Sequence, residues 1–322
     1  MDRVLDQPGS LRQRQTSRSL EAAFAVMVAL LVVAPFVIYP VFLMQALCFA
    51  LFACAFNLLI GYVGLISFGH ALFFGWASYL TAYAAKAWAA PPELAILLGT
   101  ATAAGLGLIA GGLAIRRQGI YFAMITLALA QMMYFFALRA KFTGGEDGIQ
   151  GVPRGRLFGL FDLSHELTMY AFVLAVALAG FLLIYRIINS PFGEVLKAIR
   201  ENERRAVSLG YRTERYKLVA FVLSATLAGL AGAMKSLVFQ LASLTDVHWT
   251  MSGDVVLMTL LGGLGTVFGP VVGAFLVIAM QNYLAPFGQW VLVIQGAIFV
   301  ACVLAFRRGI VGEIANRMRL RL

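Results

Sequence analysis

Residues 41–60 read VFLMQALCFALFACAFNLLI, twenty positions without a charged side chain. An α-helix needs about 20 apolar residues to cross the hydrocarbon core of a bilayer. Lipid offers the backbone no hydrogen-bond partner, so only helices and closed barrels can span it. We therefore predict that this stretch is a transmembrane helix.

Comparable apolar runs fill the chain on both sides of this stretch. They lie at 22–39, 64–85, 94–115, 119–138, 167–185, 218–240, 253–284 and 288–306. The run at 253–284 is too long for one upright helix, which rises about 1.5 Å per residue. It is also interrupted by Gly262, Gly263, Gly265, Gly269, Pro270 and Gly273. We interpret this run as two short segments, which gives about ten crossings in all.

The composition supports the same class of protein. Of the 322 residues, 61% are hydrophobic and 12% are charged, whereas a soluble domain carries about 25% charged residues. The three cysteines lie inside apolar runs, where we expect small hydrophobic side chains rather than disulfide partners. The fold class that follows is an all-α, polytopic membrane protein with about ten transmembrane segments, some of them short and interrupted by glycine.

The basic residues predict the orientation in the membrane, because Lys and Arg collect in loops that stay in the cytoplasm. Nineteen of the twenty-five lie in the tail 1–20, at Arg116–Arg117, in the segment 186–217 and after residue 306. All four groups fall on one side if 253–284 crosses twice, and both termini are then cytoplasmic. A re-entrant hairpin at 253–284 would give the same result, so charge does not separate these two topologies.

The predicted organisation has three parts. A cytoplasmic basic tail at 1–20 precedes a transmembrane domain at 21–306, and a second cytoplasmic basic tail occupies 307–322. The transmembrane domain includes an external loop at 139–166 and a cytoplasmic loop at 188–216. The first apolar run is long and carries no A-x-A cleavage site before a soluble domain, so we expect an uncleaved first span. The net charge of +10 is attributed to topology and lipid contact rather than to nucleic acid, since no basic face is interleaved with aromatic residues.

The longest polar stretch on the predicted cytoplasmic side is SPFGEVLKAIRENERRAVSLGY, residues 190–211. Ser190 is suited to cap a helix, and Pro191 suits its first position. Glu194 would lie near the positive end of the helix dipole, and Gly210 would end the helix. One interpretation is an amphipathic connector resting on anionic lipid. The other is a short helix that docks into a groove of a cytoplasmic partner.

Polar side chains inside the apolar runs are few, and such groups are costly in lipid. His70 could act as a proton relay or as a hydrogen-bonded packing residue, and no carboxylate lies in its segment to favour the relay. Lys86 and Lys235 fall near span ends, where we expect their ammonium groups to snorkel to the surface. The candidates for lining a polar pathway are Asn57, Ser67, His70, Thr126, Gln131, Ser224 and Gln281.

Glycines interrupt the apolar runs in both halves of the chain. In a transporter, such interrupted segments point to the translocation pathway, and plain helix packing is the alternative for any single glycine. Gly265, Gly269 and Gly273 recur every four residues, which predicts one shared helix face and close helix approach. The stretch 61–69 predicts a broken start to the third span. The glycines assigned to helix packing are Gly64, Gly69, Gly75, Gly265, Gly269 and Gly273.

Motifs for nucleotide chemistry are missing from the sequence. No G-x-x-x-x-G-K-[ST] is present, so this chain is not expected to bind ATP through a P-loop. A membrane-embedded enzyme would need clustered Asp, His or Cys inside the spans, and the sequence shows no such cluster. An ion-coupled transporter would need carboxylates within the membrane. The acids near the spans are all expected at span ends: Glu21, Glu93, Asp246 and Asp254.

The segment at 190–211 resembles the cytoplasmic coupling loop of the branched-chain amino acid ABC transporter permeases, the second of the two permease types in those importers. The resemblance continues through YKLVAFVLSA at 216–225. Three further blocks resemble the same family: GYVGLISFGHA at 61–71, GIYFAMITLA at 119–128 and GGLGTVFGP at 262–270. Two positions depart from the family pattern. Glu194 stands where the family more often has a basic residue, and Leu264 stands where it often has a polar or basic one.

The resemblance implies the permease subunit of an importer in the bacterial inner membrane, surrounded by lipid. Its partners would be two ATP-binding subunits, which use ATP and Mg²⁺, a second related permease and an extracytoplasmic solute-binding protein. This chain would bind no cofactor or metal and would not be an enzyme. The implied solute is a branched-chain amino acid, with urea, short amides and aromatic acids carried by relatives; an ion-coupled transporter is the alternative. By resemblance, the ATPase-coupling residues are Pro191, Phe192, Gly193, Glu194, Ala198, Ile199, Arg200, Glu201, Asn202, Arg205 and Gly210.

Overall fold

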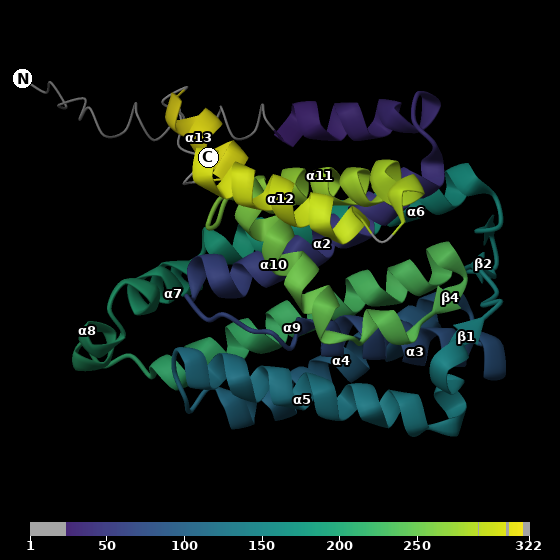
Figure 1. Cartoon of the computed structure of the whole chain (residues 1–322). Coiled ribbons are helices and arrows are strands. Elements are labelled where there is room, and N and C mark those ends of the chain that lie inside the picture. The colour runs from purple at the N-terminus through teal and green to yellow at the C-terminus, as the bar shows by residue number, and fades with distance from the viewer. Residues whose placement is uncertain (1–23, 289, 307–308, 318–322) are drawn as a thin grey trace, which may run out of the picture.

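The computed structural model describes residues 24–288, 290–306 and 309–317, and these are mostly helical (Figure 1). The tail predicted at 1–20 lies outside the described residues. The helices are Phe24–Phe36, α2 (Pro40–Tyr62), α3 (His70–Ala87), α4 (Pro92–Ala114), α5 (Ile120–Arg139), α6 (Glu166–Ile188), α7 (Pro191–Glu201), α8 (Glu203–Ser208), α9 (Thr213–Phe239), α10 (Trp249–Gly262), α11 (Gly269–Leu284), α12 (Trp290–Ala305) and α13 (Gly309–Arg317). Four short strands are β1 (Ile149–Gln150), β2 (Arg156–Leu157), β3 (Phe161–Asp162) and β4 (Leu241–Ala242).

Seven candidate spans are long and apolar enough to cross a bilayer. Six lie within the described residues: α2, α4, α5, α6, α9 and Gly269–Phe287. The seventh candidate, Val293–Glu313, also includes residues 307–308, which lie outside them. The all-α, polytopic membrane fold predicted from the apolar runs is therefore confirmed. The count of ten crossings is not decided by helix length alone, because several helices are short.

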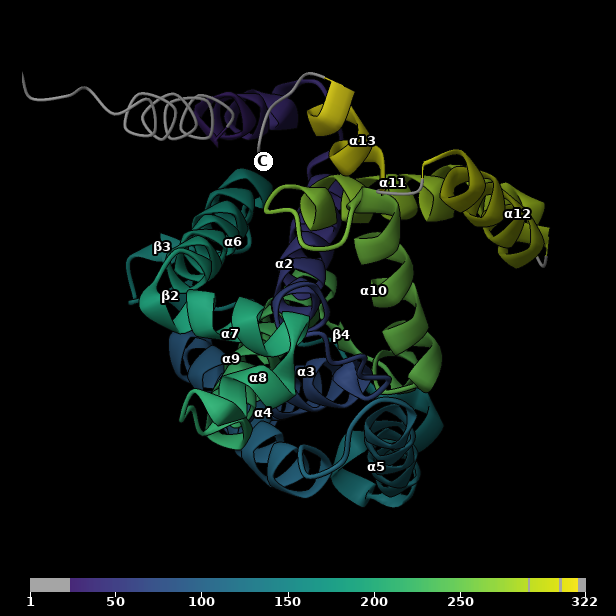
Figure 2. The same ribbon diagram turned by 90° about the vertical axis from the view of Figure 1, so that its left-hand side faces the viewer.

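Helices α2 and α9 form the centre of the bundle. α2 is apolar on all sides, as expected for a helix buried all round, and it packs against α6, α9 and α11. α9 packs against α2, α3 and α4. Figure 2 looks along the bundle and shows α2 in the middle, with α6 on one side and α10 on the other. Glycine allows α9 and α3 to approach closely: a Cβ on Gly232 of α9 would overlap the carbonyl oxygen of Phe74 in α3.

Two units of the same construction run in opposite directions. After α2, the chain turns back through 63–69 without helical structure, and α3 then begins inside the bundle. After α9, the chain turns back through 240–248, and α10 begins inside the bundle. The backbone N–H of Ala71 donates to Oγ of Ser252 at 2.9 Å, so both short helices start at the same depth. The broken start predicted for the third span is thus confirmed, and α10 provides its counterpart in the second half.

The long run at 253–284 is two helices, α10 and α11, joined by a turn at 263–268. The helices lie in close contact, since a Cβ on Gly273 would overlap the carbonyl oxygen of Met258. The prediction of one face shared by three glycines is wrong for Gly265. It lies in the turn with φ of +74°, a conformation that favours glycine, while Gly269 begins α11.

The loop at 139–166 is ordered at the other end of the bundle from α7 and α8 (Figure 1). Strand β1 pairs with β4, with Ile149 opposite Ala242, so the loop is joined to the segment that precedes α10. Lys86 of α3 donates to the carbonyl oxygen of Gln150 at 2.6 Å. These contacts hold the loop against both broken units.

Candidate functional site

The segment predicted as one helix at 190–211 is an arm of two helices, α7 and α8. Oγ of Ser190 accepts the backbone N–H of Gly193 at 3.3 Å, and Pro191 occupies the first helical position, as predicted. The single-helix prediction is wrong because Asn202 is extended, with φ of −157°, and its side chain caps α8 through the N–H of Arg205 at 3.0 Å. Asn is a preferred N-cap residue, so the break could have been read from the sequence. Gly210, with φ of +90°, lies in the turn after α8.

The two faces of α7 have different roles. Gly193, Leu196 and Ile199 are buried, and a Cβ on Gly193 would overlap the carbonyl oxygen of Ile188. Phe192 is partly buried and stacks on Tyr216 of α9, with ring centroids 5.6 Å apart. These residues hold the arm to the bundle. The coupling residues that remain exposed are Pro191, Glu194, Ala198, Arg200, Glu201, Asn202, Arg205 and Gly210.

Arg200 connects α7 to the end of α2. Its guanidinium donates to the carbonyl oxygen of Gly61. Two glycines make room for this side chain: a Cβ on Gly64 would lie 3.1 Å from Cγ of Arg200, and one on Gly265 would lie 3.2 Å from Nη1. The predicted packing glycines Gly64 and Gly265 therefore serve one contact, which the sequence did not reveal.

Asn57 of α2 extends this connection to the turn at 263–268. Its Oδ1 accepts the backbone N–H of Gly265 at 3.0 Å, and its Nδ2 donates to the carbonyl oxygen of Thr266 at 2.9 Å. Asn57 is only 3% exposed, so its amide holds the turn in place. The arm, the end of α2 and the α10–α11 turn are thereby joined.

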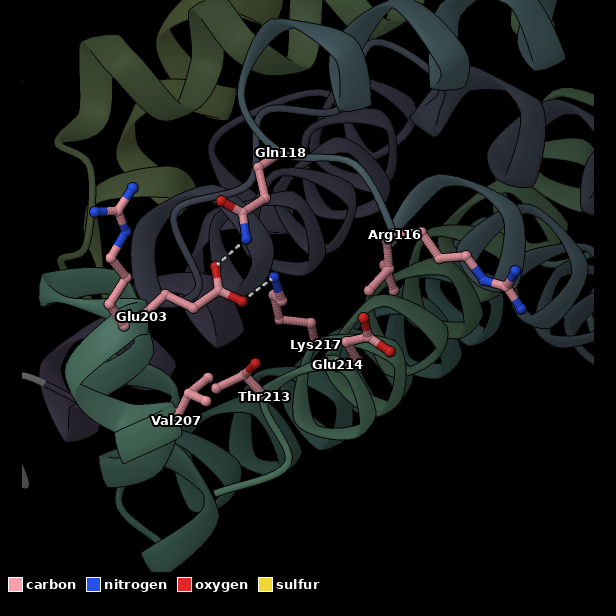
Figure 3. A pocket seen from close by; sticks show the side chains of 9 residues that line it. Arg116, Gln118, Glu203, Val207, Thr213, Glu214 and Lys217 are labelled. Carbon is pink, nitrogen blue, oxygen red and sulfur yellow. Dashed lines mark hydrogen bonds and ion pairs between the residues drawn. The ribbon is translucent and has the colours of Figure 1, made fainter. Parts of the chain in front are cut away.

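Glu203 makes the second attachment of the arm (Figure 3). Its carboxylate pairs with Nζ of Lys217 at 2.5 Å and accepts from Nε2 of Gln118 at 2.8 Å. Lys217 belongs to α9 and is almost fully buried, while Gln118 lies in the link between α4 and α5. The three side chains border an open cavity of about 390 Å³. The sequence gives no sign of this contact, because the partners are far apart in the chain.

Four of the predicted pathway residues come together where α3 begins. Oγ of Ser224 donates to the carbonyl oxygen of Ala55 at 2.5 Å, so it accepts from Nε2 of His70 at 2.9 Å. Nδ1 of His70 has no partner in the described part of the chain. The His70 ring is also enclosed by the rings of Phe56 and Phe73. This environment matches the packing interpretation of His70.

The other two residues satisfy the backbone of the stretch 63–69. Oγ1 of Thr126 accepts the N–H of Phe68 at 3.2 Å, and Oγ of Ser67 accepts the N–H of Gly69 at 3.3 Å. Gly69 is required here, since a Cβ would lie 3.1 Å from Cβ of Thr126 and still closer to its backbone. A non-helical backbone inside a membrane protein needs such partners. Gln131, which is partly buried on α5, is not among them.

Lys235 and the intramembrane acids differ from their predicted placement. Lys235 does not snorkel: its Nζ pairs with both carboxylate oxygens of Asp246, at 2.8 and 2.7 Å, and both side chains are buried. Gly75 packs against the backbone of Asp246 and Val247, which explains that glycine. Asp254 is not at a span end either, since it lies in the second turn of α10. The expectation that acids are confined to span ends is therefore wrong.

Span-length helices, two broken units and an arm attached at two points define a multi-span membrane transport protein. Residues 38–303 match the family described as "Branched-chain amino acid transport system / permease component", and the chain belongs to that family.

Among curated relatives, the high-affinity branched-chain amino acid transport system permease protein LivM of Escherichia coli is 25% identical over 293 residues, which cover 82% of this chain and 68% of the relative. A probable LivM of Methanocaldococcus jannaschii is 35% identical over 104 residues, 31% of this chain and 30% of the relative. The ribose import permease protein RbsC of Bacillus subtilis is 28% identical over 188 residues, 56% of this chain and 58% of the relative. No solved structure gave a significant match.

Proposed function

We propose that this chain is a permease subunit of an ATP-driven importer and forms half of the translocation pathway for branched-chain amino acids. Family membership supports the transport role, and the names of the LivM relatives support the solute. The similarity to a ribose import permease shows that relatives differ in solute. ATP and Mg²⁺ are used by two partner ATPases, and this chain binds neither.

The proposed topology has ten crossings with both termini in the cytoplasm of a bacterial cell. It counts Phe24–Phe36 and the broken units in addition to the longer helices. The arm carries four basic residues, Lys197, Arg200, Arg204 and Arg205, and this charge supports a cytoplasmic position for it. Gly309, the first residue of α13, packs against Gly263. Gly263 belongs to the turn that also contacts the arm, so α13 lies at the same end of the bundle as the arm. The loop at 139–166 then faces the outside and is available to a solute-binding protein.

The double attachment of the arm is the observation that carries this proposal. Arg200 ties α7 to α2 and to the turn before α11, and Glu203 ties α8 to α9. A displacement of the arm by closing ATPases would therefore move the two central helices together. The exposed side chains of Glu194, Ala198 and Glu201 form the surface offered to an ATPase, while a second permease completes the pathway.

Ala198→Arg tests the docking surface, because it adds a large cation to an exposed position of α7 without touching the buried face. We expect at least a tenfold loss of ATPase co-purification and of amino-acid uptake, with unchanged thermal stability in detergent. His165→Arg, at an exposed position on the opposite end, is the matched control and should retain ATPase co-purification. Retained co-purification and uptake in Ala198→Arg would refute the role of the arm. Uptake driven by an ion gradient without ATP would favour the ion-coupled alternative.

A further inference from the structure

Asp254 lies close to the mid-length of the bundle. The neighbouring Ser252 accepts the N–H of Ala71 at the start of α3, and His70 in turn reaches Ser224 near the middle of α9. The carboxylate of Asp254, in the second turn of α10, is therefore close to the middle of the membrane rather than at a surface. Ionisable side chains at this depth are rare and usually serve a function.

The carboxylate of Asp254 lacks a cation among the described residues. The three ion pairs found there are Lys197–Glu194, Lys217–Glu203 and Lys235–Asp246. Asp254 instead accepts one long hydrogen bond of 3.5 Å from Nε2 of Gln281 in α11. Burying an uncompensated carboxylate is costly. Asp246 has its cation in Lys235, whereas Asp254 has none among the described residues.

The surface around Asp254 is open. Asp254 itself is only partly buried, and a Cβ on the adjacent Gly253 would meet no atom within 4 Å. Val256 and Leu257 on the same helix are also partly exposed. Lipid is a poor neighbour for a carboxylate, so this part of α10 is suited to water, a polar ligand or polar groups of a partner chain.

We propose that Asp254, oriented by Gln281, lines the solute pathway and binds the protonated amino group of the transported solute. This inference rests on the proposed import function and assigns one contact within it. The ligand class is an α-amino acid or another primary ammonium compound. An uncharged sugar could donate hydroxyl hydrogen bonds to this carboxylate but would not neutralise its charge.

Cysteine labelling tests whether this position faces water. Asp254→Cys is made with Cys302→Ser, since Cys48 and Cys54 are buried, and the complete importer is treated with a charged methanethiosulfonate reagent. We expect labelling at least threefold faster than at a lipid-facing control position. Leu108→Cys is that control, because Leu108 is 56% exposed on α4 in an apolar setting. Labelling of Asp254→Cys no faster than that of Leu108→Cys would overturn the assignment.

Uptake of radiolabelled leucine tests the charge directly. Asp254→Asn keeps the size and removes the charge, and we expect at least a tenfold loss of uptake with normal recovery of the assembled complex. Asp254→Glu keeps the charge and should retain more uptake than Asp254→Asn. Equal uptake by Asp254→Asn and the unchanged protein would show that the charge of Asp254 does not bind the solute. Absence of ATP-dependent uptake by the unchanged complex would instead refute the proposed function.

Discussion

The buried pair of Lys235 and Asp246 allows a quantitative prediction. The side chains are 11% and 2% exposed, and the two Nζ–Oδ distances are 2.8 and 2.7 Å. Replacing Asp246 by Ala leaves the ammonium buried without its partner. Breaking a buried pair in this way costs about 3–5 kcal/mol. It also removes the acceptor for the backbone N–H of Ser243, at 3.2 Å from Oδ2.

Removing both charges should be far less harmful. Lys235→Met combined with Asp246→Asn eliminates the buried charges and keeps an amide oxygen for Ser243. A matched apolar or neutral replacement of a buried pair is often neutral or stabilising. The exposed pair of Lys197 and Glu194, at 37% and 68% exposure, is the control. Glu194→Ala should cost less than about 1 kcal/mol, since solvent screens exposed pairs.

The assay is thermal unfolding of the purified protein in one detergent, followed by intrinsic fluorescence. At about 2–4 °C per kcal/mol for a large domain, the loss of about 3–5 kcal/mol in Asp246→Ala should lower the midpoint by about 6–20 °C. The double variant should recover most of that loss, and Glu194→Ala should stay within about 4 °C of the unchanged protein. A midpoint for Asp246→Ala equal to that of Glu194→Ala would refute the reasoning. A double variant as unstable as the single one would show that shape, not charge, is the cause.

Two further predictions concern packing at the start of α3. Gly232→Ala should abolish recovery of folded protein in size-exclusion chromatography, because the added Cβ overlaps the carbonyl oxygen of Phe74. Gly105→Ala is the control and should be recovered normally, since its Cβ meets no atom within 4 Å. Equal recovery of the two variants would contradict the close approach of α3 and α9. Ser224→Ala should lower stability by about 1–3 kcal/mol, since it leaves Nε2 of His70 without an acceptor in a buried site. An unfolding midpoint unchanged by Ser224→Ala would exclude this hydrogen bond.

Local signals in the sequence predicted several elements well. Ser190 and Pro191 predicted the start of α7, and the run at 253–284 predicted two helices because it was too long and too rich in glycine for one. The cap at Asn202 is an equally local signal, and it divides the arm. The spacing of Gly265, Gly269 and Gly273 does not predict the role of Gly265. Regular spacing indicates a shared helix face only within one continuous helix, and α11 begins at Gly269, after Gly265.

The pattern of apolar runs and basic loops was sufficient for the class of the protein, since lipid imposes length, apolarity and charge asymmetry on each span independently of the others. Pairings between distant residues were decided only by the tertiary structure. Three of these pairings depend on how the broken helices fold back: Lys235 with Asp246, Glu203 with Lys217, and Arg200 with Gly61. That geometry also placed Asp254 at depth, where the sequence had suggested a span end. Desolvation and contact geometry set the role of a polar side chain, and both arise only when the helices pack.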